Sequence, residues 1–405
     1  MAATTLHAPT PGSMNVQGVE TPPMELKAVL AQRVPTPLTP YKANAWVQAL
    51  KDVGLQGQYP DIAQGLTEGF KVGAPSIQAT FCPPNHESTL QFVELFNRSL
   101  HHELSVGRYI GPFTHNALEG IIGPFQSSPL SIMPKPAKPG KYRIIQNFSF
   151  LYTPHNTSIL SINAQVNPDK FPCTWGTFNT ICDIIFHLPP GSQAAMQDVS
   201  EAYCTVPLHP SAWPATVICL PRDTFGVDSN LGFGYAPAAG VYRHLADAGA
   251  DIMHLHGIGP ISKWVDNHIF FWILTMVPRS TKEATFGIEG GDTPDGSYEE
   301  FDNDHRFPLH DLVPTLLRSM EDIDLISAEL GITWEKSKYI PFTSIPTFLG
   351  FNWDLETCRV LLPAQKHEKY LTAIDKWEAK YKHTLEEVQS LHGKLLHMSH
   401  ILPKG

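Results

Sequence analysis

Asp266 lies in the stretch KWVDNHIFF (263–271), where an Asp-Asn pair separates two runs rich in β-branched and aromatic residues. The pair has two interpretations. Asp and Asn tolerate the left-handed backbone of tight hairpins, so turn formation alone accounts for them. Alternatively, the carboxylate of Asp266 does chemistry at the tip of the hairpin, and that interpretation requires a second group close by.

A second carboxylate, Asp198, ends the strand that the sequence predicts over Gln193–Val199. A carboxylate at a strand end and one at a hairpin tip can lie side by side on a sheet. Two such groups hold two divalent cations about 4 Å apart, one activating an attacking hydroxyl and the other stabilising a leaving oxygen. Mg²⁺ suits this role because it prefers oxygen ligands and keeps substrate phosphates in its shell. The pair therefore predicts phosphoryl-transfer chemistry.

The elements that must position these groups follow from hydrophobic periodicity. Further strands are expected over Ile261–Val265 and His268–Leu274, a hairpin over Pro129–Phe150, and extended chain over Thr347–Trp353. Helices are expected over 42–70, 87–105, 240–256, 316–330, 363–380 and 385–398, the last opening with a Thr384–Glu387 capping box. This irregular alternation predicts an α+β fold with an antiparallel sheet.

Composition places the chain among intracellular proteins without a membrane partner. Of its 405 residues, 42% are hydrophobic, and the longest near-apolar run, Ile269–Val277, is far shorter than the roughly 20 residues of a membrane helix. No signal peptide is evident. The six cysteines are scattered without a CxxC pair, which predicts free thiols in a reducing compartment, cytoplasmic or nuclear.

The charge is unevenly distributed along the chain. The net charge is −10, but residues 281–304 carry eight acids against one lysine and so contribute −7 of it. Residues 131–143, in contrast, carry Lys135, Lys138, Lys141 and Arg143 with no acid. Because the local sign decides where a polyanion docks, the acidic total does not exclude a nucleic-acid partner.

From about Arg108 to Gly405 these stretches, in their order, resemble the fingers and palm of reverse transcriptases. They are most similar to retroelements of the tyrosine-recombinase type and related fungal open reading frames. The resemblance implies a right-hand polymerase fold. Its expected parts are a disordered Pro-rich tail (1–40), a helical N-terminal extension (41–106), fingers (107–185), a palm (186–356) with an acidic insertion at about 278–312, and a partial thumb (357–405).

The resemblance also assigns the two catalytic motifs. DVSEAY is similar to the first, with Asp198 and the Val199 carbonyl as metal ligands and Tyr203 as the aromatic gate that excludes a ribose 2′-hydroxyl. WVDN is similar to the second, with Asp266 as metal ligand and Asn267 in place of the usual second Asp. The implied cofactor is Mg²⁺ or Mn²⁺.

The remaining assignments implied by the resemblance surround these motifs. They are Arg143 with either Lys135 or Lys138 on the triphosphate, Phe233 and Gly234 at the template and nucleotide, Lys336 as general acid toward pyrophosphate, and Leu349, Gly350 and Phe351 as primer grip. Three of the assigned groups have a structural alternative: a solvated basic hairpin at 131–143, a core tyrosine at Tyr203, and an exposed lysine at Lys336.

Three functions stay open on this basis. The first is an RNA-directed DNA polymerase acting on primer–template and dNTP, with RNase H and recombinase domains supplied in trans. The second is a catalytically impaired nucleic-acid-binding remnant, because Asn267 removes one negative charge from the metal site. The third is an RNA-directed RNA polymerase, against which Tyr203 argues, because such an enzyme must admit a 2′-hydroxyl.

Overall fold

The computed structural model describes residues 38–135, 140–151, 159–273 and 319–402. Residues 1–36 and 37–405 form separate units, and the second contains every described residue. Three expectations lie outside the described residues: Lys138, the acidic insertion at about 278–312, and nearly all of the Pro-rich tail. The described part is a mixed α/β fold whose sheets are antiparallel, as the sequence predicts.

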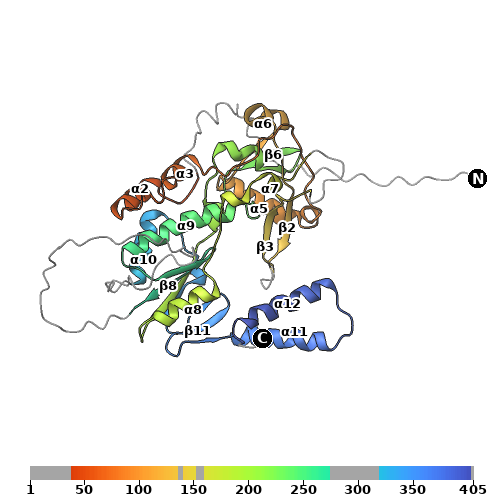
Figure 1. The fold of residues 1–405 in the computed structure, drawn as a ribbon. Coiled ribbons are helices and arrows are strands. Elements are labelled where there is room, and N and C mark those ends of the chain that lie inside the picture. The colour runs from red at the N-terminus through yellow and green to blue at the C-terminus, as the bar shows by residue number, and fades with distance from the viewer. Residues whose placement is uncertain (1–37, 136–139, 152–158, 274–318, 403–405) are drawn as a thin grey trace, which may run out of the picture. The chain divides into compact units, whose positions relative to one another are not determined.

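The central sheet has four strands in the order β7-β8-β4-β9. Its strand β8 is labelled in Figure 1. Their bounds are Ile261–Trp264 (β7), Asn267–Trp272 (β8), Gln193–Asp198 (β4) and Ile340–Thr343 (β9). Every neighbouring pair is antiparallel. The two central strands are β8 and β4. Asp198 is the last residue of β4, and Asp266 directly precedes the first residue of β8.

Helices cover both faces of this sheet, and strand alternation divides the core between them. Phe271 packs with α8 (Phe178–His187), whereas its neighbour Phe270 packs with α9 (Ala238–Leu255) and α10 (Met320–Leu330). Both rings are at most 2% exposed. A register slip of one residue would exchange these two faces, so the packing fixes where β8 begins.

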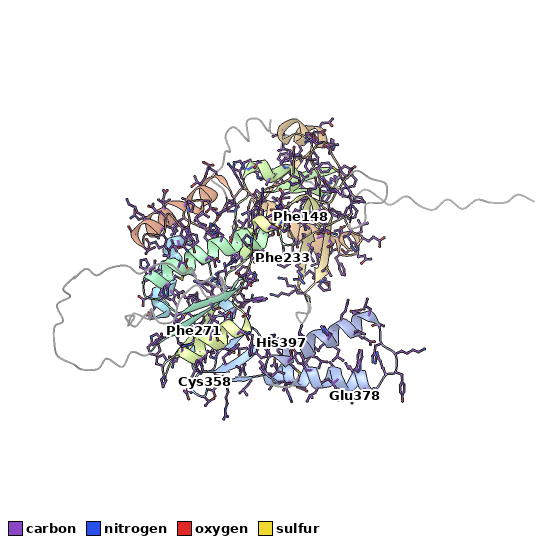
Figure 2. All side chains as sticks on the ribbon, viewed as in Figure 1. Phe148, Phe233, Phe271, Cys358, Glu378 and His397 are labelled. Atoms are coloured by element: carbon purple, nitrogen blue, oxygen red, sulfur yellow. The ribbon has the colours of Figure 1, made fainter. Side chains whose placement is uncertain are left out.

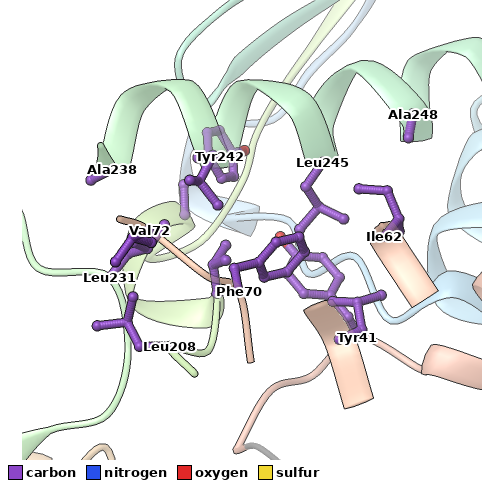
Figure 3. Close-up of a cluster of buried hydrophobic side chains, with 14 of the residues drawn as sticks. Tyr41, Ile62, Phe70, Val72, Leu208, Leu231, Ala238, Tyr242, Leu245 and Ala248 are labelled. Atoms are coloured by element: carbon purple, nitrogen blue, oxygen red, sulfur yellow. The ribbon is translucent and has the colours of Figure 1, made fainter. Parts of the chain in front are cut away.

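The N-terminal helices α2 (Ala43–Asp52) and α3 (Ile62–Glu68) pack against α9. Figure 3 shows the buried cluster that joins them, with Tyr41, Ile62 and Phe70 facing Tyr242 and Leu245 of α9. The Trp46 indole Nε1–H donates to the Leu330 carbonyl at 2.8 Å, which ties α2 to the end of α10. These helices therefore pack on the outer side of α9, over the sheet face that contains Phe270.

The hairpin predicted over Pro129–Phe150 is present as β2 (Leu130–Pro134) and β3 (Tyr142–Gln146). A second sheet, in the order β1-β6-β5, consists of Tyr109–Phe113, Thr224–Asp228 and Val217–Leu220. Around these lie short helices: α4 (Ser88–Gln91), α5 (Val93–Ser105), α6 (His115–Ile122), α7 (Ile162–Gln165), η1 (Pro168–Lys170), η2 (Ala202–Thr205) and η3 (Pro210–Ala215). Phe96 and Leu100 of α5 share a core with Ile132 of β2.

The C-terminal part contains the sheet β10-β11-β12 (Thr347–Phe348, Phe351–Asp354, Arg359–Leu361) followed by α11 (Ala364–Glu378) and α12 (Leu385–Ser399). The Thr384–Glu387 capping box is confirmed: the Glu387 N–H donates to Thr384 Oγ1 at 3.2 Å, and the Thr384 N–H donates to Glu387 at 3.0 Å. All six cysteines are free thiols, as predicted. None of the described helices is long and apolar enough to span a bilayer.

Candidate active site

Asp198 and Asp266 meet at one end of the central sheet. Asp198, the last residue of β4, pairs in register with Asn267, the first residue of β8. The Val199 N–H donates to the Asp266 carbonyl at 2.7 Å. The strand-end and hairpin-tip positions predicted from the sequence are therefore adjacent in space, although 67 residues separate the two in the chain.

The loop that holds Asp266 is strained. Trp264 pairs with Asn267, so the hairpin turn consists of Val265 and Asp266. Val265 has φ +55°, a left-handed conformation that is rare for a β-branched residue. Strain of this kind costs about 1–3 kcal/mol and persists where the surrounding structure fixes it, often at functional sites. The turn lies one residue earlier than the Asp266-Asn267 turn predicted from the sequence.

Asp198 is buried and carries an ammonium partner. Its residue is 3% exposed, and both carboxylate oxygens lie 2.7 Å from Lys338 Nζ. Burial raises the pKa of Asp198, the hydrogen bond from Lys338 opposes that rise, and the negative charge of Asp266 adds to it. Asp266 is therefore close enough to act electrostatically on Asp198.

Asn267 stabilises the neighbouring carboxylate as a donor, not as a second charge. Its Nδ2 donates to Asp266 Oδ1 at 3.2 Å. Three carboxylates would crowd this point if position 267 were Asp. The amide replaces one of those repulsions by a hydrogen bond in the metal-free protein.

An oxygen-rich cation site with few protein ligands fits this donor set. Within the described ranges, no three His, Cys, Asp or Glu side chains gather closely enough to hold a metal unaided. One carboxylate at a strand end and one in the adjacent hairpin turn suit Mg²⁺ or Mn²⁺, which completes its shell with water and substrate phosphates. Asp198 and Asp266, with the Asn267 amide oxygen and the Val199 carbonyl as further candidates, are the groups that would hold the ion.

Tyr203 borders the acid pair. It lies on η2, which begins four residues after the end of β4, and its ring contacts Phe233 (centroids 5.7 Å apart) and Tyr242 of α9 (5.5 Å, edge-to-face). Burial raises the pKa of Tyr203 to about 12, with the charges of Cys173 and Asp266 adding to the rise. The structure thus brings together three predicted residues, Tyr203, Phe233 and Asp266.

A long-range ion pair fixes the loop between Asp198 and Tyr203. Arg108 donates to Glu103 of α5 at 2.6 Å and to Glu201 at 2.7 Å. Glu201 itself adopts a left-handed backbone, φ +52°. The guanidinium therefore anchors the turn that presents Tyr203. No sequence pattern indicates this role of Arg108, because Glu201 lies 93 positions away in the chain.

The basic hairpin is exposed at the positions proposed to bind triphosphate. Arg143 pairs with Met133 across β2 and β3, and the Arg143 and Lys135 side chains are solvent-exposed. Among the described residues, neither side chain is ion-paired, and no contact joins them to Asp198 or Asp266. Their cationic groups are available to an anion, but the structure does not bring them into contact with the acids.

The root of that hairpin is attached to the segment containing Phe233 and Gly234. Phe148 stacks on Tyr235 with ring centroids 4.6 Å apart, and Asn163 donates to the Gly234 carbonyl at 2.9 Å. Gly234 has φ +93°, which only glycine adopts freely. Figure 2 labels Phe148 and Phe233 in this region. Phe233, at 58% exposed, offers an aromatic face to solvent.

Two lysines lie on η5 (Lys336–Lys338). The resemblance assigns a role to Lys336, whereas the lysine that contacts Asp198 is Lys338. Lys338 forms the ion pair described above, while Lys336 is exposed and, in the described part of the chain, is in no salt bridge. The KSK spacing alone gives no signal for which ammonium points toward the acid.

The predicted primer grip is the tight turn between β10 and β11. Leu349 and Gly350 both have positive φ, +49° and +81°, as a two-residue hairpin turn requires. The His397 ring of α12 lies parallel to the Phe351 ring with centroids 4.1 Å apart, and its Nε2–H donates to the Leu349 carbonyl at 3.1 Å. Phe351 is 1% exposed, so it joins the turn to α12 instead of presenting a free surface.

Comparison with known proteins gives structural likenesses only. No family model and no curated protein matches the chain. It is similar to the solved foamy viral protease-reverse transcriptase in complex with an RNA/DNA hybrid (16% identity, TM-score 0.48, covering 87% of this chain and 38% of that one). Two further structures of foamy viral protease-reverse transcriptase in complex with double-stranded DNA give 18% identity and TM-score 0.47 (80% and 42% covered), and 16% and 0.46 (87% and 61%).

The chain therefore spans between 38% and 61% of the length of these structures. Every TM-score is below 0.5, so no functional conclusion is drawn from the likenesses.

Proposed function

We propose that this chain is a reverse-transcriptase-like nucleotidyltransferase, an RNA-directed DNA polymerase of retroelement origin related to the tyrosine-recombinase type. One observation supports this above the others. Asp198 and Asp266, separated in sequence, meet at one end of an antiparallel sheet, and the charge of Asp266 contributes to the raised pKa of Asp198. The proposed arrangement is a right-hand polymerase with fingers (107–185), palm (186–356) and partial thumb (357–405).

In this proposal the acid pair is the metal site, loaded with Mg²⁺ or Mn²⁺. The bound ion would favour the ionised primer 3′-hydroxyl and neutralise charge on the departing pyrophosphate. The chain's own residues bind and orient the substrates. The Tyr203 ring closes the sugar pocket against a 2′-hydroxyl, which selects dNTP, and Phe233 extends that aromatic surface.

The remaining roles concern charge and grip. Arg143 and one hairpin lysine, either Lys135 or Lys138, donate charge-assisted hydrogen bonds to the triphosphate. Lys336 is the proposed proton donor to pyrophosphate. The Leu349–Phe351 turn, held by His397, positions the primer strand beside α11 and α12. Six free thiols support an intracellular location.

Primer extension tests the proposal directly. A DNA primer annealed to an RNA template is incubated with one dNTP and Mg²⁺ or Mn²⁺, using the wild type, Asp198→Ala and Asn267→Asp. We expect extension by the wild type, faster extension by Asn267→Asp by about tenfold because a third carboxylate strengthens cation binding, and none by Asp198→Ala. Extension by Asp198→Ala equal to that by the wild type, or no extension by either the wild type or Asn267→Asp, contradicts the proposal.

A second function is favoured by one specific observation, the neutral Asn267 hydrogen-bonded to Asp266. The chain would then bind primer–template without extending it. Binding would fall steeply with salt, because phosphate contacts release counterions, and would be unchanged in Asp198→Ala. Failure of extension by the wild type, with extension restored by Asn267→Asp, would identify an impaired polymerase.

A further inference from the structure

Lys338 occupies the carboxylate that a metal ion would use. Its Nζ lies 2.7 Å from both Oδ1 and Oδ2 of Asp198, so the ammonium is centred on the carboxylate. Hydrogen bonds between two charged groups are among the stronger ones in proteins. Asp198 is almost fully buried, and Asp266 adds a second negative charge beside it. A buried carboxylate without a nearby cation is strongly unfavourable, which explains why the metal-free site holds this lysine.

The backbone around Lys338 is fixed to the same strand end. The Glu335 N–H donates to the Asp198 carbonyl at 2.7 Å, and Val199 and Trp334 form a β-bridge. The Glu335 carboxylate then caps the η5 turn by accepting from the Ser337 N–H at 3.2 Å. The start of the turn thus stays beside Asp198 whatever the lysine side chain does.

The lysine side chain, in contrast, can leave. It is 44% exposed, whereas the Asp198 side chain is 4% exposed. A flexible stem of four methylenes allows the ammonium to move into water without a backbone change. An ammonium and a divalent cation bind the same two oxygens, so both cannot occupy them fully at once.

We propose that Lys338 is the resident counter-cation of Asp198, which a divalent ion must displace, and that it thereby sets the metal affinity of the site. The inference rests on the proposed metal-dependent function. Lys338 acts through Asp198 and is a positioning residue. It keeps the metal-free sheet end folded and raises the cation concentration needed to load the site.

Lys336 provides a matched control. It belongs to the same helical turn, has the same side chain and is also solvent-exposed, but within the described residues it makes no ion pair. Replacing either lysine by Met removes one positive charge from the same turn and retains most of the apolar stem. Only the change at 338 removes a contact with Asp198.

Thermal unfolding of the full chain across a Mn²⁺ titration tests the proposal without requiring catalysis. The proteins are the wild type, Lys338→Met, Lys338→Arg, Lys336→Met and Asp198→Asn. We expect Lys338→Met to lower Tm in EDTA and to reduce the Mn²⁺ concentration at half-effect about tenfold. Lys338→Arg keeps the charge and should stay close to the wild type, as should Lys336→Met. Asp198→Asn should abolish the saturable Mn²⁺ effect.

A Mn²⁺ midpoint that is unchanged or raised in Lys338→Met overturns the proposal, as does the same shift in Lys336→Met. Absence of a saturable Mn²⁺ effect in the wild type and in Lys338→Met also overturns it. Parallel primer extension separates the two claims. If the midpoint shifts as expected while no protein extends a primer, the counter-cation role stands and the polymerase proposal fails.

Discussion

Replacing Asn267 by Asp should destabilise the metal-free protein and stabilise the loaded one. The substitution exchanges the 3.2 Å hydrogen bond between Asn267 Nδ2 and Asp266 Oδ1 for two facing carboxylates. Two unit charges about 4 Å apart interact by roughly 4 kcal/mol at an effective dielectric constant of about 20, and by roughly 1 kcal/mol in bulk water. Both side chains are half-buried, so we expect a loss of about 1–3 kcal/mol in the free energy of unfolding in EDTA.

Urea denaturation measures this loss, with Asn267→Ala as the control that removes the amide without adding charge. The alanine variant should lose only about 1 kcal/mol, the value of one hydrogen bond. Mn²⁺ should then restore Asn267→Asp to at least wild-type stability, since a ligand at 100 times its Kd contributes about 2.7 kcal/mol. The reasoning is refuted if Asn267→Asp and Asn267→Ala are equally stable in EDTA, or if Mn²⁺ stabilises the two variants equally.

Three further predictions concern single residues. Val265→Gly should raise the free energy of unfolding by about 1 kcal/mol, because glycine accepts φ +55° without strain; no gain in urea denaturation would argue against a strained turn. Burial raises the pKa of Asp228 to about 7, so its stabilising contribution is complete below about pH 4 and is lost as pH rises to about 7. The free energy of unfolding of Asp228→Asn, relative to that of the wild type, should therefore increase by about 2–4 kcal/mol between acid and neutral pH. Parallel pH profiles of the two proteins would contradict this. Thr384→Ala should cost about 1 kcal/mol by removing the α12 cap while Thr384→Ser should not, as thermal unfolding would report.

The meeting of Asp198 and Asp266 could be predicted from the sequence for a physical reason. Short apolar runs in β4 and β8 indicate two buried strands, and a hairpin tip and a strand end at the same sheet edge are neighbours by geometry. The position of the hairpin turn was harder to predict from the sequence. Asp and Asn are better turn formers than Val, but burial of Phe270 and Phe271 on opposite faces fixes the register and forces Val265 into the turn.

Side-chain direction on a single helical turn could not be predicted. Lys336 and Lys338 share one turn, and the choice between them depends on where the Glu335 N–H meets the Asp198 carbonyl. Long-range ion pairs could not be predicted from the sequence either. Nothing local to Arg108 indicates that it bridges Glu103 and Glu201, because one of those partners lies on the loop after β4.

The most direct test of the central claim is Mn²⁺ binding followed by electron paramagnetic resonance, in which bound ions lose the sharp signal of free Mn²⁺. The wild type, Asp198→Asn, Asp266→Asn and the double variant are compared at equal concentration. We predict saturable binding by the wild type and a loss of affinity of about tenfold or more in each single variant, with no saturable binding in the double variant. Unchanged binding in both single variants would contradict a shared site at the end of the central sheet.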